Sequence, residues 1–490
     1  MAKSEWMFSR EKTLSGIAWN AASRVLNIGL QFIITIFLAR LLTPADFGLI
    51  GMIIVFTGFA HSLSDPGFSA ALIQKKDIEE SHLSSVFWLN ILIGISLSVL
   101  FLSLSTFMAG FYHEPRLATI AALIASIFFI QSFKMVPHTL LIRSLEFRKL
   151  AIVDTVTTML AGVTAISLAL SGYGVWSLAW QAVVSAFVSM MIVWRVSGWK
   201  PCLLFKFGAI RELLKFSMNL FGFNLYHYWV KNIDNLLIGK FIGSAGLGIY
   251  SRAYDILLMP VNQISATVGQ VMFPSLSKIK DDKERFREIY LEAISGVAFI
   301  AFPLMMGLFV VADSFVLALY GGKWTQMIPI VRVFCLLGVV YSVAATAGWI
   351  YNAQGRTDWL LWWGLASGAL MMLGIVVGVI IGTPLAVAVC FATVSGVIHI
   401  YPQFTIPGKL INMGLSDVLR SVSGVFICSV MMAGGVWFLG QVLPPSLDHI
   451  SRLLLQIPLG IVTYMFLVYA LKVRTCVSIL SVLKGYGIKA

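Results

Sequence analysis

The stretch "LARLLTPADFGLI" at residues 38–50 interrupts a long apolar run, and "IGKFIGSAGLGIY" at 238–250 interrupts another two hundred residues later. Each stretch has one cation, two apolar residues, a short break, a glycine, and then renewed apolar sequence. The cations are Arg40 and Lys240, and the glycines are Gly48 and Gly248. The cation and the glycine have the same spacing in both stretches, and this indicates an internal repeat.

Composition assigns most of the chain to lipid. Of its 490 residues, 59% are hydrophobic and only 12% are charged, whereas soluble domains are about 25% charged. The net charge of +13 does not indicate a nucleic-acid partner, because the cations lie in short connectors between apolar runs and not on one basic face. The five cysteines form no CxxC pair and predict no metal site.

Apolar runs long enough to cross a bilayer predict an all-α integral membrane protein with fourteen transmembrane helices. Gly and Pro in the short links end these helices for steric reasons. The predicted spans are 14–39, 47–73, 84–109, 117–141, 151–170, 174–194, 214–239, 246–273, 290–312, 326–351, 359–381, 384–404, 418–440 and 452–471.

The distribution of cations gives the orientation. With a cytoplasmic N-terminus, 24 Lys and Arg residues fall in inside segments and 5 in outside loops, as the positive-inside rule requires. One miscounted span would destroy this alternation, so both termini are predicted to be cytoplasmic. The first apolar run is too long for a signal peptide and lacks a cleavage site, and we expect it to remain as an anchor.

Six spans in 14–194 and six in 214–404 predict two parallel six-helix lobes related by a pseudo-twofold axis, because an even number of spans starts each lobe from the same side. The predicted domains are residues 1–200 (helices 1–6), 201–410 (helices 7–12) and 411–490 (helices 13–14 and a cytoplasmic tail). Two facing lobes leave a central cleft that rocking exposes to alternate sides, which favours a transporter.

Eight motifs occur in order over residues 10–325, and on the fourteen-span plan they are similar to Wzx-type polysaccharide flippases, a branch of the multidrug/oligosaccharidyl-lipid/polysaccharide exporter superfamily. The colanic-acid exporter branch is the one they resemble most. The motifs are "REKTLSG" (10–16), "LARLLTPADFGLIGM" (38–52), "LSDPGFSAALIQKKDI" (63–78), "FWLN" (87–90), "RSLEFRKLA" (143–151), "NIDNLLIGKFIGSAGLGIYSRAYDI" (232–256), "FPSLSKIKDD" (273–282) and "GGKW" (321–324).

The resemblance implies a V-shaped, monomeric protein of the bacterial inner membrane. It would flip undecaprenyl-diphosphate-linked oligosaccharide units for exopolysaccharide or lipopolysaccharide export. The resemblance implies contacts with membrane lipids and with polysaccharide polymerase or export proteins, and it leaves coupling to a proton or sodium gradient open. No other cofactor is implied.

Three other functions stay open. They are a lipid-linked peptidoglycan precursor flippase, a drug/cation antiporter of the same superfamily, and a membrane glycan-processing enzyme. The chain has no P-loop, HExxH, GxSxG or dinucleotide motif, and its outside loops are short, so a transporter is favoured over an enzyme. Buried cations exceed buried acids in the first lobe, which favours an anionic cargo over a cationic drug.

Ionisable residues within spans are the candidate sites, because a charge in the membrane core costs about 2.5–3.5 kcal/mol and should face a wet interior. Arg24, about ten residues into the first span, is a candidate for binding a diphosphate or acidic sugar; the alternative is an ion pair with a carboxylate of the second span. His61 and Asp65 are four residues apart and could carry a proton, although Asp65 before Pro66 and Gly67 is also typical of a cap at a helix break.

The seventh span is unusually polar. Asn224, His227 and Lys231 follow a helical stripe, with Tyr228 and Asp234 nearby, and such a wet face could bind sugars. Lys231 and Asp234 could instead form an ion pair that allows both to be buried.

Other charged or small residues favour structural roles. Arg252 and Asp255 repeat the spacing of three; we include them as a substrate-binding and an ion-coupling candidate, with pairing the favoured role. Lys134 and Arg332 are expected to extend toward the nearer membrane surface, and Asp154 is expected to start a helix. Glycines at 374, 378 and 382 predict close helix packing.

Overall fold

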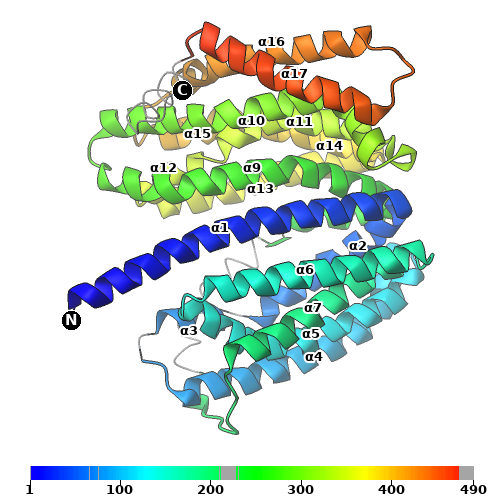
Figure 1. Cartoon of the computed structure of the whole chain (residues 1–490), viewed down its shortest axis with the longest axis vertical. Helices are drawn as coiled ribbons and strands as arrows, with labels where there is room; N and C mark the ends of the chain where they lie inside the picture. Colours follow the sequence, from blue (N-terminus) through cyan, green and yellow to red (C-terminus); the bar gives the residue numbers. More distant parts are fainter. Residues whose placement is uncertain are drawn as a thin grey trace. The chain divides into compact units, whose positions relative to one another are not determined.

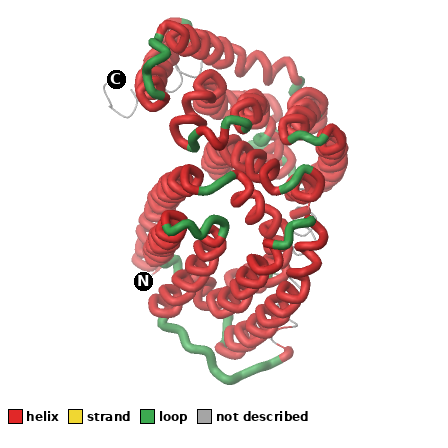
Figure 2. Tube along the Cα trace, turned by 90° about the vertical axis from the view of Figure 1, so that its right-hand side faces the viewer, coloured by secondary structure: helices red, strands yellow, loops and turns green. Residues whose placement is uncertain are grey.

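The computed structural model describes residues 2–65, 67–75, 77–208, 210, 228–229 and 231–473, and over these ranges every regular element is a helix (Figure 2). Thirteen helical segments within them are long and apolar enough to cross a membrane, and each matches a predicted span. The all-α, multi-pass prediction is thus confirmed. Most of the predicted seventh span, 214–239, lies outside the described residues, so the number fourteen stays a prediction.

Figure 1 labels the helices used below. Their bounds are α1 Ala2–Leu41, α2 Pro44–Ser64, α3 Phe68–Gln74, α4 Glu80–Tyr112, α5 Arg116–Arg143, α6 Phe147–Leu170, α7 Trp176–Ser197, α9 Ser244–Lys278, α10 Lys283–Leu319, η1 Gly322–Trp324, α11 Met327–Ala344, α12 Ala347–Ala353, α13 Thr357–Ile381, α14 Pro384–Thr393, η2 Val394–Ile398, α15 Ile400–Gly408, α16 Leu415–Val442 and α17 His449–Ala470.

The chain forms two compact units, Met1–Gly248 and Ile249–Ala490. In the first unit α4 packs along α5, α6 along α7 and α1 against α6 (Figure 1). In the second, α10 packs against α11 and α16, and α17 lies beside α16. The predicted domain boundaries at 200 and 410 and the symmetry of the lobes stay predictions.

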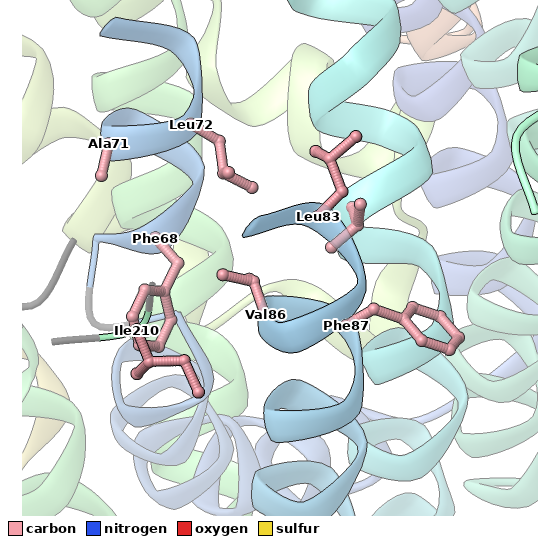
Figure 3. Close-up of a cluster of buried hydrophobic side chains, with 8 residues drawn as sticks. Phe68, Ala71, Leu72, Leu83, Val86, Phe87 and Ile210 are labelled. Carbon is pink, nitrogen blue, oxygen red and sulfur yellow. The ribbon is translucent and has the colours of Figure 1, made fainter. Parts of the chain in front are cut away.

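A helix break gives the first unit a small separate core. Gly67 adopts a left-handed backbone (φ 101°), which glycine tolerates best, and it starts the short helix α3 after α2 has ended. Apolar side chains of α3 then face those of α4 and one residue of the link between the predicted lobes (Figure 3). The labelled cluster comprises Phe68, Ala71, Leu72, Leu83, Val86, Phe87 and Ile210.

The same link is held on the start of α4 by hydrogen bonds. The Trp88 indole N–H donates to the Cys202 carbonyl oxygen (2.9 Å), and the Cys202 N–H donates to the Ser84 hydroxyl (3.0 Å). The Lys206 N–H donates to the Ser85 hydroxyl (2.8 Å). These bonds satisfy backbone groups that a loop would otherwise leave to water.

The second unit shows the close packing that its glycines predict. A Cβ atom on Gly378 would lie 2.5 Å from the Cα of Val387, and one on Gly374 would lie 2.7 Å from the Val394 side chain. At these two positions α13 approaches α14 and η2 at a distance that only glycine permits. Gly382 differs, because it follows α13 with a left-handed backbone (φ 84°) and a Cβ atom there would meet nothing within 4 Å, so the prediction of close packing is wrong at this position. Elsewhere in this unit, the Tyr464 hydroxyl of α17 donates to the Phe299 carbonyl oxygen of α10 (2.8 Å).

The two similar links are in contact within the first unit; they are residues 38–50 and 238–250. A Cβ atom on Gly48 would lie 1.7 Å from the carbonyl oxygen of Ser244, and one on Gly248 would lie 1.8 Å from that of Pro44. The contact is reciprocal, because each glycine meets the residue four positions before the other glycine. We call this contact between Pro44, Gly48, Ser244 and Gly248 the glycine crossing.

Candidate functional site

Charged side chains meet across α5 and α6 in the first unit. Lys134 of α5 interacts electrostatically with Asp154 of α6 and with His138, which lies four residues further along its own helix. Lys134 and His138 are half-buried, whereas Asp154 is exposed. Since an isolated charge in lipid is costly, the cluster indicates a face that water or a polar ligand reaches.

Arg24 lies on α1, which packs on α6 close to Asp154. The Asn27 amide of α1 donates to the Thr155 hydroxyl of α6 (3.4 Å). Arg24 lies one turn before Asn27, and Asp154 directly precedes Thr155. The hydrogen bond thus places the two charged residues on neighbouring turns of packed helices, and Arg24 is exposed there.

These three charges lie at similar distances from one end of their helices. Counted from the ends that the charge distribution predicts to be outside, Arg24 lies 17 residues along α1, Lys134 18 along α5 and Asp154 16 along α6. At 1.5 Å per residue these positions are about 24–27 Å from those ends. We call Arg24, Lys134 and Asp154 the charged layer.

The chemistry of the charged layer is that of an anion site. It combines two basic side chains with one acidic side chain, and guanidinium and ammonium groups bind phosphate oxygens. The imidazole of His138 lies four residues from Lys134 on the same helix. Among the described residues no group of three or more His, Cys, Asp or Glu side chains could hold a metal ion.

One expectation about this region is corrected. Asp154 does not start a helix, because α6 begins at Phe147, and Asp154 is therefore two turns inside it. Lys134 is half-buried, and its extension toward the nearer membrane surface stays a prediction. The sequence analysis missed His138, although its spacing of four from Lys134 was a usable signal.

The predicted stripe of the seventh span is described only in part. Asn224 and His227 lie outside the described residues. Lys231 is exposed, whereas Asp234 is buried and accepts a hydrogen bond from the Asn235 N–H (2.8 Å). The two side chains thus lie in different surroundings, and their roles in substrate binding stay predictions.

Tyr228 is the third described residue of that stripe, and it has a defined partner. Its hydroxyl donates to the carbonyl oxygen of Val55 (2.6 Å), and that of Ile54 lies 3.1 Å away. A Cβ atom on Gly58 would lie 2.5 Å from the same hydroxyl, so α2 accommodates the tyrosine through a glycine. A role of Tyr228 in substrate binding stays a prediction beside this structural contact.

Asp65 caps the helix break. It follows the last residue of α2, and its carboxylate accepts hydrogen bonds from the N–H groups of Gly67 (3.1 Å) and Ser69 (3.2 Å). The structural role favoured from the sequence is confirmed. His61 is exposed in the last turn of α2, and ion coupling by either residue stays a prediction.

Two of the ion pairs in the second unit involve residues named in the sequence analysis. Arg252 pairs with Asp255 at 3.2 Å, so the favoured pairing is confirmed, whereas substrate binding by Arg252 and ion coupling by Asp255 stay predictions. Arg332 of α11 pairs with Asp313 of α10. The sequence analysis assigned Arg332 to the membrane surface and missed this partner, because the two residues lie on different helices.

Comparisons with known proteins agree with this description. A family model described as "Polysaccharide biosynthesis protein" matches residues 37–329. The chain is 31% identical to the teichuronic acid biosynthesis protein TuaB of Bacillus subtilis over 93% of this chain and 95% of that protein. It is 30% identical to the lipopolysaccharide biosynthesis protein WzxC of Escherichia coli over 72% of each chain.

Among solved structures, the fold is similar to that of the lipid II flippase MurJ in an inward closed conformation. The TM-score is 0.72, with 16% sequence identity, over 91% of this chain and 97% of that one. At this identity the likeness concerns the fold alone.

Proposed function

The chain belongs to the polysaccharide biosynthesis protein family, and from this premise we propose that it flips a lipid-linked oligosaccharide across the membrane. It is a multi-pass membrane transporter and not an enzyme. The proposed cargo is an undecaprenyl-diphosphate-linked repeat unit, moved from the inner to the outer leaflet of a bacterial inner membrane for assembly into a surface polysaccharide.

The charged layer is the observation that supports this cargo. A diphosphate of a lipid in the inner leaflet lies near the inner boundary of a hydrocarbon core about 30 Å thick. The predicted orientation puts Arg24, Lys134 and Asp154 about 24–27 Å from the outer ends of their helices, which is close to that boundary. The two basic side chains of the layer would replace water around the phosphate oxygens. A cationic drug would be repelled by the same layer, which disfavours the antiporter alternative.

The finer features of the proposal come from the sequence. They are two parallel six-helix lobes, fourteen spans, both termini in the cytoplasm, a monomer, alternating access and coupling to an ion gradient. The reciprocal form of the glycine crossing supports the repeat, because equivalent positions of the two stretches make equivalent contacts. Polysaccharide polymerase and export proteins are the proposed protein partners.

A gene deletion tests the proposed function. We expect loss of the surface polysaccharide and accumulation of its lipid-linked repeat unit in the inner leaflet, measured by extraction of lipid-linked sugars and by surface labelling. A plasmid copy should restore both. Normal surface polysaccharide with new drug sensitivity would overturn the proposal in favour of an antiporter, and lysis with stranded peptidoglycan precursor would indicate the other flippase.

Lys134→Ala tests the charged layer itself. A hydrogen bond to a charged group contributes about 1.5–3 kcal/mol, so the rate of flipping in reconstituted vesicles should fall roughly tenfold to a hundredfold. Lys149→Ala is the matched control, because Lys149 is exposed on α6 and pairs only with a neighbour, Glu146, at 3.7 Å. Equal rates for both variants, at equal expression, would remove Lys134 from the site.

A further inference from the structure

A buried histidine in the second unit has a ring nitrogen without a partner. His399, directly after η2, is 9% exposed, and no hydrogen-bond partner for its Nε2 lies among the described residues. The hydroxyl of Ser395, 5% exposed and one turn earlier, is also without one within the same part of the chain. Orphaned polar atoms at this burial are rare, because each costs about 1–3 kcal/mol.

The hydrogen bonds beside the ring involve other side chains. The Gln403 amide nitrogen donates to the Ala344 carbonyl oxygen (2.9 Å), and the Gln403 amide oxygen accepts a hydrogen bond from the Trp363 indole N–H. Both polar groups of Gln403 thus have partners, whereas the His399 Nε2 has none among the described residues. An imidazole nitrogen that carries the lone pair can accept a proton.

The backbone places the histidine at a local irregularity. η2 is one turn of π-helix, in which the His399 N–H bonds to the carbonyl of Val394, five residues earlier. Pro402 follows within a turn and has no N–H to offer the carbonyl of Ile398. Such π turns are rare and occur often at functional sites. The Trp363 ring packs against the His399 ring, with ring centroids 4.8 Å apart.

The helices packed around η2 and α15 supply no buried carboxylate to neutralise a charge on this ring. Their two acids lie at helix starts and pair with arginines, Asp358 with Arg356 and Asp417 with Arg287. Two further arginines lie on these helices: Arg332 pairs with Asp313, and Arg420 is exposed. The remaining titratable residues on these helices are cysteines and tyrosines: Cys335, Tyr341, Tyr351, Cys390, Tyr401 and Cys428.

We propose that His399 is a proton-binding site that couples a proton to the transport cycle, which rests on the proposed function. Nε2 accepts a proton from water to give an imidazolium, and it later returns that proton to water on the other side. An imidazolium buried without a counter-charge is unfavourable. Protonation therefore favours a conformation in which water reaches the ring. A proton that binds two conformations with different affinities shifts the equilibrium between them, as a coupling ion must.

A titration followed by NMR tests the site without transport. The whole chain, labelled with ¹³C and ¹⁵N histidine, is placed in lipid nanodiscs. The His399 signal is assigned by its loss in His399→Gln and, independently, by its shift in Trp363→Phe. We expect the Nδ1–H tautomer at high pH and an imidazolium at low pH, with the change between pH 5 and 8. A ring that stays neutral across this range would overturn the proposal.

A second experiment asks whether the proton drives transport. The probe is undecaprenyl-diphosphate-linked oligosaccharide in vesicles with an imposed gradient of one pH unit, which a one-proton coupling converts into at most about a tenfold effect. We expect stimulation for the wild type and for the control His449→Gln, an exposed histidine. His399→Gln should flip at the rate without a gradient. Stimulation of His399→Gln equal to wild type overturns the proposal.

The two experiments separate failure of this proposal from failure of the proposed function. A wild type that flips cargo but ignores the pH gradient overturns proton coupling and leaves flipping intact. A wild type that does not flip cargo contradicts the proposed function, whereas the NMR titration still decides whether His399 binds a proton.

Discussion

The stretches 38–50 and 238–250 share a pattern of one cation, a short break and a glycine, but different hydrogen bonds stabilise them. Both place a glycine on the backbone of the other stretch, at hypothetical Cβ distances of 1.7 and 1.8 Å. In the first stretch a local capping box starts α2: the Thr43 N–H donates to the Asp46 carboxylate (2.9 Å), and the Asp46 N–H donates to the Thr43 hydroxyl (3.4 Å). The start of α2 is therefore capped by residues of its own stretch.

The second stretch is tied to the end of α4. The Lys240 ammonium donates to the backbone carbonyl oxygen of Phe111 and lies 4.8 Å from the centre of the Phe111 aromatic ring. It is also 3.3 Å from the His113 Nδ1. The Ser244 hydroxyl donates to the Glu114 carboxylate (3.2 Å). Both stretches thus contribute equivalent glycines to the glycine crossing. In the second stretch, Lys240 and Ser244 also bind the end of α4.

Substituting the glycines should have the largest effect. Gly48→Ala or Gly248→Ala places a Cβ atom inside a carbonyl group, so α2 and α9 must separate, at a cost of about 3 kcal/mol or more. We expect both variants to lose most export and to unfold at lower temperature in detergent. Comparable losses would support the equivalence of the two stretches.

Gly51→Ala is the matched control for this prediction. Its Cβ atom would lie 3.2 Å from the tip of the Leu247 side chain, which can move. If Gly48→Ala were as stable and active as Gly51→Ala, the glycine crossing would not be a close backbone contact.

Removing Lys240 should have the next largest effect. Lys240→Met loses a charged hydrogen bond to Phe111 and a cation–π contact, for which we expect about 2 kcal/mol of destabilisation. Thermal unfolding of the variant and of the wild type measures the loss, and an unchanged unfolding temperature would contradict the anchoring to α4.

Tyr228→Phe should have a moderate effect and separates two roles. Loss of the hydrogen bond to Val55 should cost about 1 kcal/mol of stability without changing the apparent affinity for cargo. Tyr173→Phe is the control, since that side chain is 58% exposed. A fall in cargo affinity with unchanged stability would instead support the predicted role of Tyr228 in substrate binding.

Thr43→Ala should have the smallest effect. It removes the side-chain cap of α2, for which about 0.5–1 kcal/mol is typical, and it leaves the glycine crossing in place. We expect a small fall in unfolding temperature and nearly normal export. A large loss of export would show that the capping box, and not the glycine contact, positions the start of α2.

The spans and the helix break could be predicted from sequence because their causes are local. An apolar run of about 20 residues must enter lipid, and Asp65 before Pro66 and Gly67 supplies both a cap and a conformation that ends α2. The Arg252–Asp255 pair was equally accessible, because a spacing of three puts both residues on one helix face.

The charged layer could be predicted only in part. Arg24 was found because it interrupts an apolar run, but its depth was taken from an estimated start of the span. Lys134 and Asp154 were given separate structural roles, since nothing in the sequence states that α5 and α6 bring them together. His399 went unnoticed, because its importance comes from burial and from its packing against Trp363.

The sequence by itself determined that most of the chain lies in lipid, the order of its helices, the repeated link with its glycine, and the points where helices break. Each depends on the free energy of residues close together in the chain. Only the tertiary structure decided that Gly48 touches Ser244, that Lys134 interacts with Asp154 and that the His399 Nε2 is buried without a partner among the described residues. Those contacts depend on the rotation and depth at which whole helices pack, and a lipid-facing apolar pattern leaves both undetermined.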